Sequence, residues 1–467
     1  MDILLLLYCL LFLTYSSYLC LKIRNNFWNV ENFFALQILI IYIFAPINII
    51  IFGSEIYEYD LKTYLTPASR YVSFSSFFTT LIFILAFIGG VAFRGSLPKS
   101  VELSIRKFNG TVVYRVTAYF LSLLSLVSLL VYIQEFGGFS AFIYNLDLSR
   151  SGLLSDDMVG RFAFVGRFID LAFIPLVYYL YRKCKIKTDL IFLLFIPLSV
   201  IVFSNLFISG SKLKFIGLGL LLYFTFSLKK KKLYLTYLFL FLVIVFLGLP
   251  ILDEVFILAY RVFNSEGILA VPFRIASAIL SGSLGQGQYE AFLKDSSANL
   301  YLKSVDYFVP GQISLQLSID RSYSLLFFRD FYTGISDLLP SRLNITTGLE
   351  VHRLNTSIYY DYYPEIPVLT WGVPPGIMAF GMYSLSVPGV IIIAFALGYI
   401  FRLVDLFFKS IIEIDRGFSA FYAYTIFVLG CYPISGMPKL VIYNLIILIF
   451  VFLFFFVNFK FRIKTSK

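Results

Sequence analysis

Long apolar stretches separated by short polar connections dominate the chain and predict helices that cross a membrane. A helix of about 20 apolar residues spans the hydrocarbon core of a bilayer, and about eleven runs approach that length. Their predicted bounds are 3–21, 33–53, 72–93, 111–134, 165–181, 190–209, 213–228, 233–250, 386–401, 418–432 and 440–459. The pattern therefore predicts an all-α polytopic membrane protein.

One long polar stretch interrupts this pattern and contains the only histidine of the chain. It divides the chain into a first helical part (1–250), a large loop (251–370) and a second helical part (371–467). Within the loop, two places with helical apolar spacing predict amphipathic helices that lie at the membrane interface. These two places are 252–264 and 268–280.

The stretch 372–384, which follows the large loop, is apolar but too short to cross a bilayer. It predicts a half-helix that dips into the membrane and returns, a structure tolerated where protein or a water-filled cavity covers its ends. The aromatic residues between Tyr359 and Trp371 fit a belt of amphipathic rings at the outer interface. Stacking of these rings on sugar faces is the alternative.

Composition and charge placement agree with the membrane class and predict an orientation. Hydrophobic residues make up 59% of the chain and charged residues 14%, with a mean hydropathy of +0.86. The net charge of +11 gathers in alternate connections, whereas the large loop has eight Lys/Arg against twelve Asp/Glu, a net charge of −4. By the positive-inside rule, the N-terminus and the loop are expected outside and the C-terminus in the cytoplasm. The basic excess therefore indicates orientation and contact with membrane lipids, not a nucleic-acid partner.

Basic side chains near the predicted outer face are the first candidates for function. Charged groups at a membrane edge are costly, so each is a candidate site, and arginine holds phosphate oxygens bidentately. A group of them would suit a lipid diphosphate head group. For any single residue, the alternative to ligand binding is that its side chain extends to the membrane interface or pairs with a nearby acid. The candidates for diphosphate binding are Arg150, Arg161, Lys212, Arg274, Arg342 and Arg353.

His352 is the second candidate, because an imidazole ring suits a general base near neutral pH. Glu350, Asp361 and Glu365 are nearby carboxylates that are rivals for the same role. A surface-loop histidine without a role is the alternative. A lone histidine cannot supply a three-ligand zinc site, and the large loop lacks cysteine. No metal and no cofactor is therefore expected.

Three stretches resemble the Wzy-type O-antigen polymerases, which join the oligosaccharide repeat units of bacterial surface polysaccharides. The first is 150–181, where arginines in a predicted external loop lead into an apolar helix. The second is Ser209-Gly210-Ser211-Lys212, a turn of small and basic residues at a helix start, where the family often has arginine instead of lysine. The third is Pro374-Pro375-Gly376-Ile377 after the large loop. The order of helices and loop extends the resemblance over nearly the whole chain.

The resemblance implies a membrane glycosyltransferase with a GT-C-like fold in the bacterial inner (plasma) membrane. Its substrates would be undecaprenyl-diphosphate-linked oligosaccharides at the periplasmic face, and its partner a chain-length-regulating co-polymerase. The basic candidates would stabilise the departing diphosphate, and His352 or a nearby carboxylate would take the acceptor proton. Two other functions stay open. An O-antigen ligase shares the donor and the loop, although Arg353 follows His352 where a ligase usually has Asn, Ser or Gln. A polysaccharide flippase or ion-coupled transporter is the third.

Overall fold

A computed structural model gives the fold of this chain as helices joined by turns. It describes residues 2–26, 28–52, 71–93, 110–135, 137–138, 163–182, 199, 212–230, 236–237, 240, 258, 262, 266, 270–281, 308–336, 350–359, 373–414, 416–438 and 441–442. Over these ranges the regular elements are all helical. The protein is therefore an α-helical membrane protein, as the apolar pattern predicted.

Five helices in the described part of the chain are long and apolar enough to cross a membrane. They are Ile3–Arg24, Val30–Phe52, Phe74–Ala92, Thr117–Glu135 and Gly376–Glu413. Shorter apolar helices are Phe168–Tyr178, Gly217–Leu228 and Ser419–Ser435. The predicted runs 190–209, 233–250 and 440–459 lie almost entirely outside the described residues. The number eleven therefore stays a prediction.

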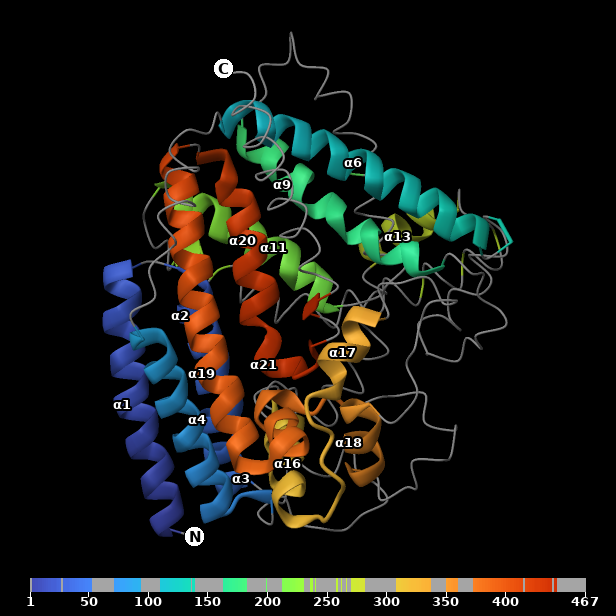
Figure 1. Ribbon diagram of the computed structural model, residues 1–467. Coiled ribbons are helices and arrows are strands. Elements are labelled where there is room, and N and C mark those ends of the chain that lie inside the picture. The colour runs from blue at the N-terminus through green and yellow to red at the C-terminus, as the bar shows by residue number, and fades with distance from the viewer. Residues whose placement is uncertain are drawn as a thin grey trace. The chain divides into compact units, whose positions relative to one another are not determined.

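The chain divides into two compact units of helices (Figure 1). Unit 1 joins Met1–Ala118 to Tyr301–Lys467, and unit 2 is Tyr119–Leu300. The long apolar helices of unit 1 are α1 (Asp2–Asn26), α2 (Val30–Leu39) continued by a π-helical segment (Ile40–Phe44) and α3 (Ala45–Phe52), α4 (Phe74–Ala92) and α19 (Gly376–Ile414). Two shorter apolar helices, α20 (Ser419–Gly430) and α21 (Tyr432–Ser435), follow α19.

Aromatic rings and glycines hold the helices of unit 1 together. The ring of Phe34 on α2 lies 5.0 Å from that of Phe401 on α19 and 4.9 Å from that of Phe87 on α4. A side chain at Gly90 or Gly398 would collide with the backbone of the facing helix, so α4 and α19 approach closely. Small residues permit such backbone contact between membrane helices, where packing replaces the hydrophobic effect as the driving force.

A sharp turn at Leu385 and Ser386 divides α19 into a short helix, 376–384, and a long one, 387–414. The turn is tight enough that Gly381 packs against Val390. This short helix occupies the stretch for which the sequence predicted a half-helix, and its depth in a bilayer stays a prediction. The long helix extends to residue 414, well beyond the predicted range 386–401, and its last part contains charged residues.

Asp405 explains how α19 continues through charged positions. It is 4% exposed, and its carboxylate accepts hydrogen bonds from the N–H groups of Val30 (3.1 Å) and Glu31 (3.4 Å) and from the Tyr422 hydroxyl (2.6 Å). The first N–H groups of a helix have no partner within the helix, so Asp405 caps the start of α2. The predicted run 386–401 ended before Asp405, whereas α19 continues to Ile414.

Gly376, the first residue of the short helix, stands where the structure has no room for a side chain. It has a φ of +71°, and an added Cβ would collide with the Tyr42 hydroxyl. The left-handed conformation costs a non-glycine residue roughly 1–2 kcal/mol. We expect Gly376→Ala to lower the thermal unfolding midpoint of the purified protein, and the double variant with Tyr42→Phe to recover part of the loss. A Gly376→Ala protein as stable as the wild type would contradict this packing.

Unit 2 contains most of α6 (Gly110–Glu135), a 3-10 helix (Ala163–Ala172) that leads into α9 (Phe173–Arg182), α11 (Lys212–Lys230) and α13 (Val271–Leu280). The Ser125 hydroxyl on α6 donates to the Phe168 carbonyl at 3.3 Å, and α9 packs against α11. On α13, Phe273 is 78% exposed. The predicted runs 111–134, 165–181, 213–228 and 268–280 thus coincide with helices, with bounds shifted by a few residues.

Candidate functional site

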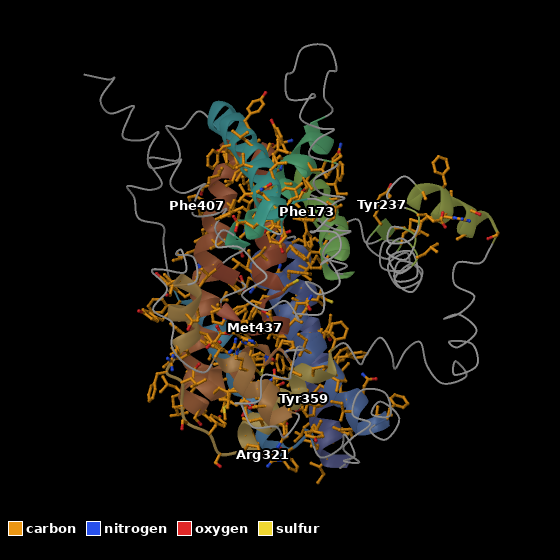
Figure 2. The ribbon with its side chains drawn as sticks, turned by 90° about the vertical axis from the view of Figure 1, so that its right-hand side faces the viewer. Phe173, Tyr237, Arg321, Tyr359, Phe407 and Met437 are labelled. Atoms are coloured by element: carbon orange, nitrogen blue, oxygen red, sulfur yellow. The ribbon has the colours of Figure 1, made fainter. Side chains whose placement is uncertain are left out.

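Three helices from the large loop form a polar layer in unit 1. They are α16 (Val309–Asp320), α17 (Arg329–Ser336) and α18 (Val351–Tyr359), and Figure 1 shows α16 and α18 toward the end where α1 begins and α17 nearer the middle of the unit. Gln312 donates to the Tyr71 carbonyl at 3.2 Å, and the Ser73 hydroxyl donates to Gln316 at 2.8 Å, which fixes α16 to the start of α4. In Figure 2, Arg321 and Tyr359 lie in this part of unit 1, whereas Phe407 lies toward the other end.

His352 and Glu350 form a pair at the start of α18. The Nδ1 atom of His352 lies 2.9 Å from a carboxylate oxygen of Glu350, and the two side chains are 29% and 15% exposed. His352 thus belongs to a helix, not to the surface loop that was the alternative. A carboxylate that accepts a hydrogen bond from Nδ1 fixes the tautomer and orientation of the ring and leaves Nε2 to accept a proton. The pair has the chemistry of a general base with its orienting acid.

Asp330 joins the starts of α17 and α18. It is 4% exposed, and its two carboxylate oxygens lie 3.0 and 3.3 Å from the backbone nitrogen of Val351, which donates to them. The positive end of the helix dipole favours an anion at this position. Asp330 therefore sets where α18 begins, immediately next to the His352–Glu350 pair.

Asn355, one turn after His352, fixes the inner face of α18. It is fully buried; its amide nitrogen donates to the Ser314 hydroxyl (3.0 Å) and the Val373 carbonyl (2.9 Å), and its amide oxygen accepts from the Tyr383 hydroxyl (3.1 Å). The partners come from α16, from the segment before α19 and from the short helix of α19. Three bonds from three segments define the rotation of α18 and hence the direction of His352.

Tyr323 packs beside this network without being a candidate base. Its ring lies 4.7 Å from that of Tyr383, and its hydroxyl donates to the Ser318 carbonyl at 2.8 Å. Burial raises the pKa of Tyr323 to about 12, so the phenol stays protonated at neutral pH. Its role is that of a hydrogen-bond donor.

The structure brings some of the predicted site residues together and leaves others apart. His352 and Glu350 are paired, and Arg353 follows them with an exposed side chain. Arg274 belongs to unit 2, where it is paired with Glu266 at 2.9 Å on an exposed surface. Lys212 is the first residue of α11, and its side chain is outside the described set. Also outside the described residues are Arg150, Arg161, Arg342, Asp361 and Glu365.

Asp330, Asn355 and Tyr383 are site residues that the sequence analysis missed. Their partners lie far along the chain, so no local spacing marks them. The only local hint was a polar side chain close to apolar residues at helical spacing, as Asn355 is close to Leu354 and Ile358. Among the residues that the structure describes, no group of three or more His, Cys, Asp or Glu is placed to hold a metal ion.

Fold and site together define an α-helical membrane protein that carries a buried polar network and an imidazole–carboxylate pair on helices of its large loop. Comparison of the chain with protein-family models, with curated proteins and with solved structures finds no match. The chemistry of the site and the resemblance found in the sequence are therefore what indicate a function.

Proposed function

We propose that this protein is a membrane glycosyltransferase that polymerises undecaprenyl-diphosphate-linked oligosaccharide repeat units into surface polysaccharide. The observation that carries the proposal is the His352–Glu350 pair, 2.9 Å apart, on a loop helix at one end of an apolar helical unit. A base at this place suits a substrate whose lipid is in the bilayer and whose sugars are in water. The proposal includes the periplasmic face of the inner membrane, about eleven membrane helices and a GT-C-like arrangement.

In the proposed reaction, His352, Glu350 and Arg353 each have one role. A hydroxyl oxygen of the acceptor sugar bonds to the anomeric carbon of the donor while the bond from that carbon to the diphosphate oxygen breaks. The acceptor proton goes to Nε2 of His352, and Glu350 stabilises the resulting imidazolium. The diphosphate leaves as an anion, so cations are needed more than an acid. Arg353 beside His352 is the described candidate for that task, together with the basic residues proposed from the sequence.

Deleting the gene in its native bacterium and separating the surface polysaccharide by gel electrophoresis tests this function against its two rivals. Loss of a polymerase should leave lipid A core carrying a single repeat unit, and re-expression of the chain should restore the ladder of lengths. Long chains that are made but unattached would identify a ligase instead. Absence of both long chains and single units would identify a flippase.

A further inference from the structure

The eight-residue helix α17 has its apolar side facing outward. Its inner face buries small and polar residues, with Asp330 at 4%, Thr333 at 6% and Ser336 at 6% exposure. Its outer face exposes Tyr332 (58%) and Ile335 (59%). In water, a helix turns its large apolar side chains inward, because each costs about 2 kcal/mol when left exposed. The outer face of α17 therefore suits an apolar surrounding.

The turn before α17 extends the same apolar surface and is held rigidly. Leu325 is 38% exposed and Phe327 69% exposed. Phe327 and Phe328 have φ values of +46° and +56°, a conformation that is uncommon for bulky residues. Two backbone hydrogen bonds maintain it, from Leu326 to the Tyr383 carbonyl (3.0 Å) and from Phe327 to the Ser384 carbonyl (2.9 Å). Strained backbone that neighbours hold in place points to a function for the side chain that it presents.

Charge and length indicate what covers this face. Arg329 at the start of α17 is exposed, whereas Asp330 beside it is buried. A helix of eight residues is about 12 Å long and cannot cross a bilayer, so it fits the boundary between head groups and acyl chains. Arginine at that level meets lipid phosphates while aromatic and aliphatic side chains enter the acyl layer.

We propose that the outer face of α17 with its preceding turn, residues Leu325, Phe327, Phe331, Tyr332 and Ile335 bordered by Arg329, is a docking surface for anionic phospholipid. The lipid phosphate binds Arg329, and the acyl chains lie against the aromatic rings. Because Asp330 ties α17 to the start of α18, the bilayer then holds the helix that carries His352. This lipid site does not depend on the proposed enzymatic function.

Photocrosslinking in vesicles tests the docking surface. The full-length chain, with p-benzoylphenylalanine in place of Phe331 or Ile335, is reconstituted into vesicles of equal parts phosphatidylcholine and phosphatidylglycerol, illuminated and analysed by mass spectrometry. The matched control position is Phe380, which is fully buried and whose ring lies 5.8 Å from that of Phe331. We expect phospholipid adducts at positions 331 and 335 and adducts within the protein at 380.

Head-group selectivity tests the role of Arg329. Adducts at position 331 should favour phosphatidylglycerol, and Arg329→Gln should reduce that preference about fivefold, whereas Arg329→Lys should retain it. Adducts of position 331 or 335 with other segments of this chain or with a second copy would overturn the proposal, as would the absence of adducts. Equal labelling of both lipids by the crosslinking protein that retains Arg329 would overturn the proposed preference of this surface for anionic lipid. None of these readouts requires polymerase activity, so the failure of either proposal is recognised separately.

Discussion

His352→Ala is expected to lower the rate of repeat-unit polymerisation by about two to four orders of magnitude, the usual contribution of a positioned general base. Binding of the lipid-linked donor should change little, because the side chain acts on the acceptor proton. Glu350→Gln should give a smaller loss, since an amide oxygen still accepts a hydrogen bond from Nδ1 but no longer balances the charge of the imidazolium. The rates are to be measured with purified protein in vesicles, under saturating donor.

The matched control for this experiment is Ile358→Leu, a change of shape on the same helix away from the pair. It should accumulate in the membrane and polymerise at the wild-type rate. His352→Arg separates two roles, because an arginine supplies charge but cannot accept the proton. Normal turnover in both His352→Ala and Glu350→Gln would remove the pair from the reaction and transfer the role of base to another carboxylate.

Asn355→Leu is the substitution for which we expect the largest loss of folded protein. It leaves the buried Ser314 hydroxyl, Val373 carbonyl and Tyr383 hydroxyl without their partner, at about 1–3 kcal/mol for each unsatisfied group. A free-energy loss of several kcal/mol approaches the whole stability of a small domain. The yield of monodisperse protein after solubilisation, compared with that of the wild type, measures the effect.

Tyr383→Phe separates positioning from folding within the same network. It removes one hydrogen bond to Asn355, worth about 1 kcal/mol, so the protein should still fold. We expect turnover to fall about fivefold at unchanged KM, because α18 then holds His352 less firmly. In a His352→Ala background the same change should have no further effect. An equal loss in both backgrounds would show that Tyr383 acts on structure alone.

Apolar periodicity predicted most of the described membrane helices, because the cost of transferring each side chain into lipid is decided locally. Thus 3–21 lies within α1, 33–53 overlaps α2 to α3, and 72–93 matches α4. The same reasoning failed at Asp405, where a charged residue continues α19. Its cost is offset by hydrogen bonds from α2 and α20, and a local window contains neither helix.

The candidate site was predictable only where its partners are close in sequence. His352 and Glu350 stand two positions apart, and both were named from the sequence. Asp330 binds a backbone group 21 positions away, and Asn355 binds a hydroxyl 41 positions away. Such pairs depend on how α16, α17 and α18 pack against the short helix of α19, which no periodicity encodes. Arg274 was predicted to bind diphosphate, and the structure shows it in an exposed, local ion pair with Glu266 instead.

The most direct test of the central claim is in vitro polymerisation. The purified full-length chain in vesicles is given a synthetic undecaprenyl-diphosphate-linked repeat unit, and the lipid products are separated by mass. Polymerase activity predicts oligosaccharides of two or more repeat units on one lipid, with one undecaprenyl diphosphate released for each bond formed, and formation of these products about two to four orders of magnitude more slowly by His352→Ala. Unchanged repeat units with folded wild-type protein, or their transfer across the bilayer without a new glycosidic bond, would contradict it.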